Sequence, residues 1–144
     1  METTPSHLGI CVADLDRSMR FYCEGLGFEA GDGFDLSSDA APGLDRALEV
    51  DGPVEIRSQY ITNGEMRIEL IGWRDRVVSG EPSSRRDQPG ITHLSFWVAD
   101  VDAVAAHLAD LGGTILATTR TNPGVELVFL ADPDGIRVEL MQRP

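Results

Sequence analysis

Four side chains that can hold a metal ion recur at matching points of the sequence. His7 and His93 each open a strand-like run, and Glu69 and Glu139 each lie in the run that closes a repeated segment. Two imidazoles and two carboxylates suit a divalent metal of intermediate hardness, such as Ni, Co, Zn, Mn or Fe(II), in an octahedral site with open positions. We therefore predict one divalent metal as the cofactor, these four residues as its ligands, and chemistry at the open positions.

The four positions belong to an internal repeat that covers most of the chain. The ten residues from His7 (HLGICVADLD) match the ten from His93 (HLSFWVADVD), and the segment RIELI at 67–71 matches RVELM at 137–141. Each copy starts as an alternating strand, continues into an amphipathic helix capped by an aspartate, and ends with a hairpin that carries the glutamate. Each copy therefore predicts the order β-α-β-β-β.

The repeat sets the expected fold and its boundaries. We expect an α+β protein made of two tandem βαβββ modules, which form a curved, cup-shaped mixed sheet with the helices on the outside. Residues 1–144 form one domain, with module 1 at about 5–72, a linker at about 73–90 and module 2 at about 91–142. The first copy is about 16 residues longer, and we place the extra residues in 32–52, with a short helix around 44–48.

Strand alternation predicts which face carries the four ligands. Side chains of successive strand residues point to opposite faces, so the apolar residues that alternate with His7 and His93 should meet the helices. The same rule places Glu69 and Glu139 opposite the apolar residues of their strands. All four ligands are then expected on the face turned away from the helices. The competing interpretation is that the histidines are structural and the glutamates pair with Arg67 and Arg137.

The composition limits the class of partner. Twenty-four acidic residues against 12 basic ones give a net charge of -12, which argues against nucleic acid or an anionic membrane as the partner. No apolar run approaches the length of a membrane span, and the N-terminus lacks a signal-peptide pattern. We expect a cytoplasmic protein that binds a small molecule. Cys11 and Cys23, the only cysteines, are expected to be reduced and buried.

The repeat and its motifs resemble the glyoxalase, bleomycin-resistance and extradiol-dioxygenase (vicinal oxygen chelate) superfamily. The resemblance is carried by DLDRS and FYCEGLGF within residues 7–28, by the segment 90–101 and by the segment 132–139. In metal-dependent members the ligands come from the first and last strands of each module. The matching positions here are those of the two histidines and two glutamates, and the ligand pattern is most similar to that of glyoxalase I.

The resemblance implies a metal-dependent isomerase or lyase. A substrate with two adjacent oxygens would chelate the metal, and an enolate or enediolate of it would be stabilised. In glyoxalase I a ligand glutamate can leave the metal and act as the general base, so Glu69 or Glu139 is the catalytic candidate. Two alternatives are an Fe(II) or Mn(II) ring-cleaving dioxygenase and a protein that sequesters a drug or metabolite without turnover. Such proteins commonly dimerise, and a homodimer is expected, with the site within one chain or across two.

Candidate substrate-binding residues follow from the hairpins. Counting back from two- or four-residue loops pairs Ser58 with Glu69 and Tyr60 with Arg67, which would direct these side chains to the ligand-bearing face. The same counting pairs Val128 with Glu139 and Leu130 with Arg137. A three-residue loop would reverse the parity and favour Arg57 and Gln59. Trp97 shares a face with His93 and is either a substrate contact or a core residue.

Overall fold

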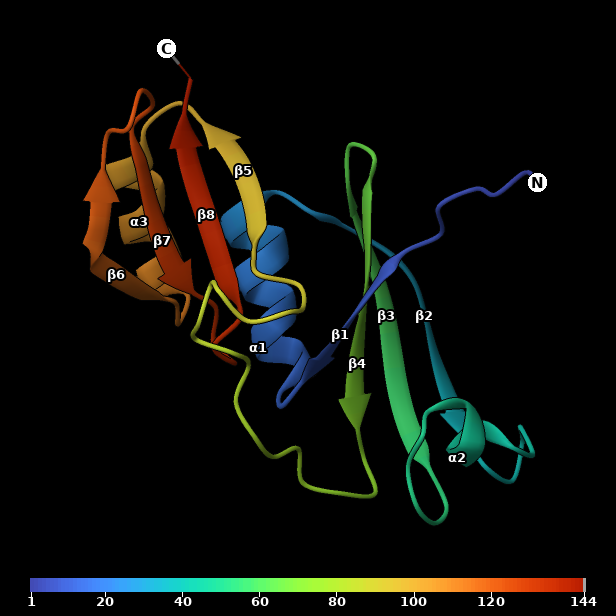
Figure 1. Ribbon diagram of the computed structural model, residues 1–144. Helices are drawn as coiled ribbons and strands as arrows, with labels where there is room; N and C mark the ends of the chain where they lie inside the picture. The colour runs from blue at the N-terminus through green and yellow to red at the C-terminus, as the bar shows by residue number, and fades with distance from the viewer. Residues whose placement is uncertain (144) are drawn as a thin grey trace. The chain divides into compact units, whose positions relative to one another are not determined.

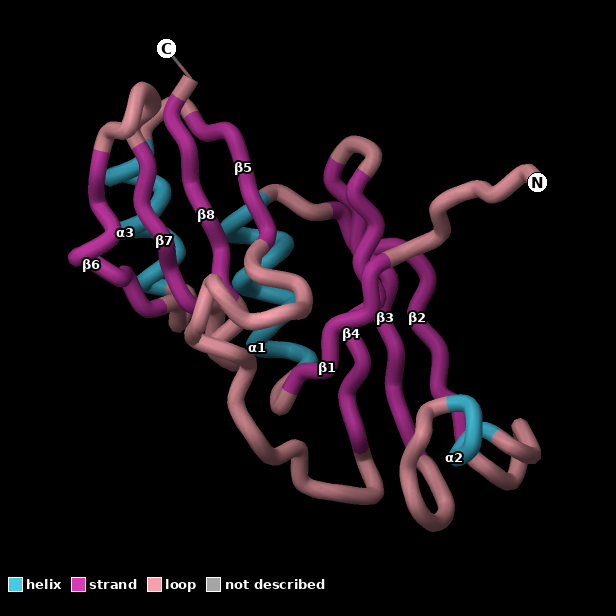
Figure 2. The backbone as a smooth tube through the Cα atoms, viewed as in Figure 1, coloured by secondary structure: helices cyan, strands magenta, loops and turns pink. Residues whose placement is uncertain are grey.

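The computed structural model describes residues 1–143, and its secondary structure follows the repeat (Figures 1 and 2). The first copy contains β1 (Leu8–Val12), α1 (Leu15–Met19), its π-helical continuation η1 (Arg20–Gly25), β2 (Glu29–Ser37), α2 (Leu44–Ala47), β3 (Glu55–Asn63) and β4 (Met66–Trp73). The second contains β5 (Leu94–Val98), α3 (Val101–Asp110), β6 (Thr114–Thr121), β7 (Leu127–Ala131) and β8 (Arg137–Gln142). The predicted α+β class and the two βαβββ modules are confirmed.

Each module forms a four-stranded mixed sheet with the same topology. The strand orders are β1-β4-β3-β2 and β5-β8-β7-β6. The first and last strands of each module are parallel neighbours, and the other pairs are antiparallel. A parallel pair needs a long crossover connection, here the helix and two further strands. The strand that follows each histidine therefore lies directly beside the strand that carries the glutamate.

The buried core of each sheet is formed by the residues that alternate with the predicted ligands. These core residues are Ile10, Val12, Ile61, Ile68 and Leu70 in the first sheet, and Leu94, Val128, Leu130, Val138 and Leu140 in the second. In the second module α3 contributes the buried Val101, Ala105 and Leu108, and its N-terminus is capped by Asp100, whose side chain accepts bonds from the amides of Asp102 and Ala103. The predicted division into an apolar and a polar face holds in both modules.

The chain forms two compact units whose boundaries differ from those of the repeat. The first unit comprises residues 1–16 and 27–79, and the second comprises residues 17–26 and the chain from residue 80. Most of the first helix therefore packs within the second unit, where Phe21 and Tyr22 are fully buried. This exchange cannot be read from helical periodicity, because an amphipathic helix does not encode which sheet it covers.

The extra residues of the first copy lie slightly later than predicted. Strand β2 extends to Ser37 and pairs with β3, with a register shift between Ala30 and Gly33, so the insertion occupies 38–54 rather than 32–52. An edge strand of this kind tolerates the Gly and Asp residues that led us to expect a loop. The short helix predicted around 44–48 is confirmed as α2. Among residues 1–143, none of the helices has both the length and the apolar character needed to cross a membrane.

Candidate metal centre

The first module brings one histidine and one glutamate together. His7 lies immediately before β1, and β1 runs parallel to β4 with Gly9 opposite Glu69. His7 Nε2 is 3.0 Å from Glu69 Oε2, and the two side chains are 30% and 13% exposed. The pair is accessible but substantially shielded, as expected for residues that bind a small ligand.

The second module repeats this arrangement. His93 lies immediately before β5, and Ser95 is the residue opposite Glu139 across β5 and β8. His93 Nε2 is 3.4 Å from Glu139 Oε2, with side-chain exposures of 30% and 14%. Of the four residues predicted as ligands, the structure therefore brings together the two of each module.

The geometry of each pair fits two adjacent ligands of one metal ion. Ligand atoms about 2.1 Å from a metal and at right angles to each other are about 3 Å apart. The separations of 3.0 and 3.4 Å lie in that range. Within residues 1–143 no third His, Cys, Asp or Glu side chain joins either pair to complete a cluster. Each module thus provides two donors, and neither provides a complete site.

The other nitrogen of each imidazole has its own hydrogen-bond partner. His7 Nδ1 is 3.0 Å from the hydroxyl of Ser6, and His93 Nδ1 is 2.8 Å from the hydroxyl of Thr92. Such a contact fixes the orientation of the ring and leaves Nε2 directed at the glutamate, as hydrogen bonds to the second nitrogen of a metal-binding histidine do. Sequence reasoning missed both hydroxyls, although extending the repeat by one residue towards the N-terminus would have revealed them.

An aromatic ring packs against each histidine from the strand on the other side of the glutamate strand. Tyr60 lies opposite Glu69, and its ring centroid is 5.3 Å from that of His7 at 69°. Phe129 lies opposite Glu139, and its ring centroid is 5.2 Å from that of His93 at 86°. Edge-to-face packing of this kind favours a defined ring orientation. The two modules thus share a hydroxyl, a histidine, an aromatic residue and a glutamate.

The predicted hairpin registers are wrong in both modules. In the first, the two-residue turn 64–65 pairs Asn63 with Met66, so Tyr60 faces Glu69 and Ser58 faces Ile71. The observed pairing differs from the predicted one by two residues, so Ser58 and Tyr60 still lie on the face of Glu69. The alternative candidates, Arg57 and Gln59, lie on the opposite face. In the second, Ala131 pairs with Arg137 across a five-residue turn, which places Phe129 beside Glu139 and directs Val128 and Leu130 into the core.

The competing role for the glutamates is not the one observed. The carboxylates of Glu69 and Glu139 lie against the histidines, whereas Arg67 lies 4.0 Å over the Tyr60 ring. Arg137 donates to the carbonyl of Gly135 at 2.8 Å. Neither arginine forms an ion pair within residues 1–143.

The two glutamates differ in their restraint. The hydroxyl of Ser95 donates to Glu139 Oε2 at 2.7 Å, the same oxygen that faces His93. The corresponding position beside Glu69 is Gly9, which has no side chain to donate a bond. Glu139 is therefore tethered by its neighbouring strand, and Glu69 lacks that tether.

Other candidate residues are placed more variably. Ser58 is fully buried, and within residues 1–143 its hydroxyl has no hydrogen-bond partner. Trp97 is 49% exposed with Arg143 at 5.8 Å from its ring, which excludes the core interpretation.

The expectation that both cysteines are buried is wrong, because Cys11 is exposed and Cys23 is half-buried. Cys11 lies on the polar face of its strand, at the same parity as His7.

Comparison with known proteins agrees with this arrangement. Residues 4–140 match the model of the Glyoxalase/Bleomycin resistance protein/Dioxygenase superfamily. The chain belongs to this superfamily. The sequence is 32% identical to a 2-epi-5-epi-valiolone epimerase of an Actinomyces species, over 96% of this chain and 78% of the relative.

Solved structures of superfamily proteins share the fold. A glyoxalase family protein from Bacillus cereus aligns with a TM-score of 0.76 at 19% identity, covering 99% of this chain and 95% of its own. The fosfomycin resistance protein FosX from Listeria monocytogenes, solved with Mn(II) and sulfate, aligns with a TM-score of 0.63 at 16% identity, covering 100% and 95%. At these identities the likeness extends to the fold alone.

Proposed function

We propose that this member of the superfamily is a metal-dependent isomerase or lyase that acts on a small molecule with two adjacent oxygens. His7, Glu69, His93 and Glu139 would bind one divalent ion. The observation that carries the proposal is the duplicated His–Glu pair, in which each imidazole faces a carboxylate through Nε2 and is held by a hydroxyl through Nδ1.

The comparisons support this class of reaction over the two alternatives. The epimerase relative points to proton transfer at carbon, and the Mn(II) complex of FosX shows that this fold accommodates a divalent ion. A facial-triad oxygenase needs only two histidines and one carboxylate, so the fourth donor argues against that chemistry. A sequestering protein without metal would have no use for two matched pairs with their supporting hydroxyls.

The residues of this chain have separable roles in the proposed reaction. A bound divalent ion would act as a Lewis acid on the adjacent oxygens of the substrate and make the neighbouring C–H group more acidic. Glu69 is our candidate for the general base, because Gly9 leaves its carboxylate free to turn towards that proton. Glu139, tethered by Ser95, would remain a fixed ligand. Proton return from Glu69 to the substrate completes an isomerisation.

Side chains on the same face would bind the substrate. Tyr60 lies against His7 and beneath Arg67, and its half-buried ring presents an apolar surface next to the proposed ligands. Trp97 is exposed on the face of its strand that also bears Ser95. Ser58 lies on the same face, but its hydroxyl is fully buried and is therefore not accessible to a substrate. We propose contacts with the substrate for Tyr60, Trp97 and Arg67.

Metal content is the decisive measurement for the proposal. Protein purified without an affinity tag or chelator is analysed by plasma mass spectrometry, beside a variant with His93→Ala and Glu139→Ala. We expect about one equivalent of Ni, Co, Zn, Mn or Fe per chain in the wild type and its loss in the variant. A wild type that stays metal-free after incubation with each ion would overturn the proposal. Mass measurement of the native protein then assigns the metal to single chains or to homodimers.

The role of the base is tested by hydrogen exchange. Deuterium uptake from D2O into an α-hydroxyketone probe is followed by NMR for Glu69→Gln and Glu139→Gln, with metal content measured in each. We expect Glu69→Gln to retain part of its metal and lose exchange by at least about 100-fold. Retained exchange in Glu69→Gln at full metal occupancy would assign the base elsewhere.

A further inference from the structure

We propose that a cavity on the ligand-bearing face of the second sheet is a subsite for a carboxylate or phosphate group, bound by Arg86 and Arg137. This inference rests on the proposed function, in which two adjacent oxygens of the substrate bind the metal. It adds that another part of the same substrate carries an anionic group. The substrate would then be a small acid or phosphorylated compound with two adjacent oxygens.

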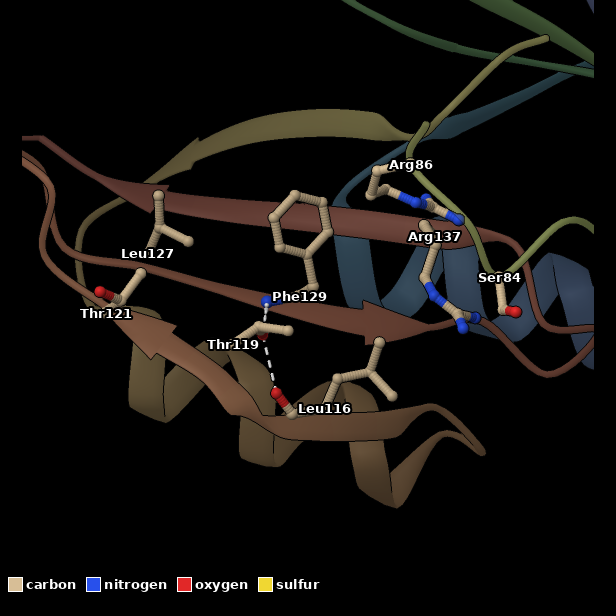
Figure 3. A pocket seen from close by; sticks show the side chains of 8 residues that line it. All are labelled: Ser84, Arg86, Leu116, Thr119, Thr121, Leu127, Phe129 and Arg137. Carbon is tan, nitrogen blue, oxygen red and sulfur yellow. Dashed lines mark hydrogen bonds between the residues drawn. The ribbon is translucent and has the colours of Figure 1, made fainter. Parts of the chain in front are cut away.

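The cavity lies on the same face of the sheet as His93 and Glu139. It has a volume of about 370 Å³ and is lined by Ser84, Arg86, Leu116, Thr119, Thr121, Leu127, Phe129 and Arg137 (Figure 3). Phe129 lies opposite Glu139, and Leu116 and Leu127 share its face through their pairing. A volume of this size suits a small metabolite.

The cavity directly adjoins the proposed metal ligands. Phe129 contacts the ring of His93, and Arg137 precedes Glu139 by two residues on β8, so their side chains share one face about 7 Å apart along the strand. A molecule whose adjacent oxygens lie at the His93–Glu139 pair would therefore extend over Phe129 towards the two guanidinium groups.

The charge of the cavity differs from that of the whole chain. The chain has twice as many acidic as basic residues, yet the cavity lining contains two arginines and no acidic residue. Five other arginines, Arg17, Arg74, Arg76, Arg85 and Arg120, form ion pairs, whereas within residues 1–143 Arg86 and Arg137 form none. Two uncompensated guanidinium groups at one cavity favour an anionic ligand.

Both guanidinium groups are oriented by the backbone and retain free donors. Arg86 donates to the carbonyls of Thr92 and Ser83, and Arg137 donates to the carbonyl of Gly135. A guanidinium group has five N–H donors, so each arginine keeps donors for a carboxylate or phosphate oxygen. Bonding to carbonyls fixes the orientation of each group without neutralising its charge.

The experiment follows anion binding at the arginine side chains by NMR. The full-length ¹⁵N-labelled chain, as purified and after dialysis against a chelator, is titrated with glutarate or with inorganic phosphate at constant ionic strength. We expect saturable shifts of the Arg86 and Arg137 Nε–H signals at millimolar concentrations. Arg137→Gln and Arg86→Gln should each weaken binding at least about fivefold. Arg20→Gln, an exposed arginine outside the cavity, is the control with the same change in charge.

Each outcome decides the proposal. Saturation with phosphate alone identifies a phosphorylated substrate, saturation with glutarate alone identifies a carboxylic acid, and saturation with both leaves the anionic class established. The absence of saturation with either ion, or equal affinity in an Arg86→Gln/Arg137→Gln double variant with an unchanged amide spectrum, overturns it. Because the titration also uses metal-free protein, anion binding can succeed where the metal proposal fails, and the converse also holds.

Discussion

The two modules carry the same His–Glu pair but restrain it to different degrees. In the second module Ser95 tethers Glu139, and the half-buried Thr92 holds His93. In the first module a glycine replaces the tethering serine, and His7 is held by the exposed Ser6. Both copies therefore keep the imidazole and the carboxylate, but the hydrogen bonds that hold them are more numerous and less exposed in the second copy.

The modules also differ in how they use the arginine two residues before each glutamate. Arg67 lies over the Tyr60 ring, whereas Phe129 replaces the tyrosine in the second module and Arg137 lines a cavity. The charge of Arg67 is partly satisfied by the aromatic face. That of Arg137 remains available to a ligand. An arginine at the same repeat position therefore packs on a neighbouring ring in the first copy and lines a cavity in the second.

The strongest test of equivalence between the modules removes one histidine at a time. His7→Ala and His93→Ala should each lower metal affinity at least about 100-fold, because each removes one donor of the proposed four. Affinity is measured by competition with a chromophoric chelator, and circular dichroism controls for folding. A variant that binds metal as tightly as the wild type would remove its module from the site.

A second test concerns the hairpin turns, which differ in length and charge. The second module's turn carries the buried Asp132, which accepts a hydrogen bond from the hydroxyl of Tyr22 at 2.8 Å. Tyr22→Phe should lower the free energy of unfolding by about 1–3 kcal/mol, since it removes a hydrogen bond to a buried carboxyl group. Urea denaturation measures the loss. No change in midpoint would show that the bond contributes nothing to stability.

The effect of Tyr22→Phe should depend on pH. Burial raises the pKa of Asp132 above its usual range, and the Tyr22 hydroxyl opposes that rise. A raised carboxyl pKa in the folded state destabilises the protein as pH rises through the interval from the unfolded to the folded value. Removing the hydroxyl raises the folded pKa further. The loss of stability should therefore be largest at neutral pH and smaller below the unfolded pKa, where Asp132 is protonated in both states.

Exchanging the tether between modules tests its role directly. Ser95→Ala should lower metal affinity by about tenfold, and Gly9→Ser should increase it by a smaller factor, because a hydrogen bond from a serine hydroxyl to the carboxylate orients it as a ligand. The added Cβ at Gly9 would lie 3.8 Å from Ile71, an ordinary contact. The same chelator competition measures both. Equal affinities in all three proteins would show that the Ser95 bond is incidental.

The smallest expected difference lies in the hydroxyls behind the histidines. Thr92→Val should reduce metal affinity by up to about tenfold and Ser6→Ala by less, because water can replace the bond made by exposed Ser6. Each variant removes the hydrogen bond between a hydroxyl and the Nδ1 atom of the following histidine. A larger loss in Ser6→Ala than in Thr92→Val would contradict the ranking of the modules.

The repeat and strand alternation predicted most of the fold. HLGICVAD and HLSFWVAD, each followed by a helix and closed by a glutamate strand, specify the βαβββ order. The parity of Ile68 and Leu70 against Glu69 specifies the polar face. Both rest on local periodicity, which one sequence displays fully.

The errors arose where pairing depends on turn length or tertiary packing. The turn between Ala131 and Arg137 has five residues, so Phe129 pairs with Glu139 in place of the predicted Val128. This shift of one residue moves every side chain of the strand to the opposite face. The burial of a cysteine and the unit in which a helix packs depend on contacts distant in sequence. The cavity with Arg86 was also inaccessible to sequence analysis, because that residue lies in a segment without periodicity.

Residues 17–26 pack in the second unit, so the protein cannot be cut between its two repeats without separating this helix from the sheet it covers. Phe21 and Tyr22 of this segment are buried in the second unit, and Arg17 forms an ion pair with Asp134. A truncated product that starts near residue 80 would leave the Asp132 carboxyl buried without its tyrosine donor. The sequence shows two separate repeats, but a split between them should give an N-terminal fragment whose helix is unpacked and a C-terminal fragment that needs this helix supplied in trans.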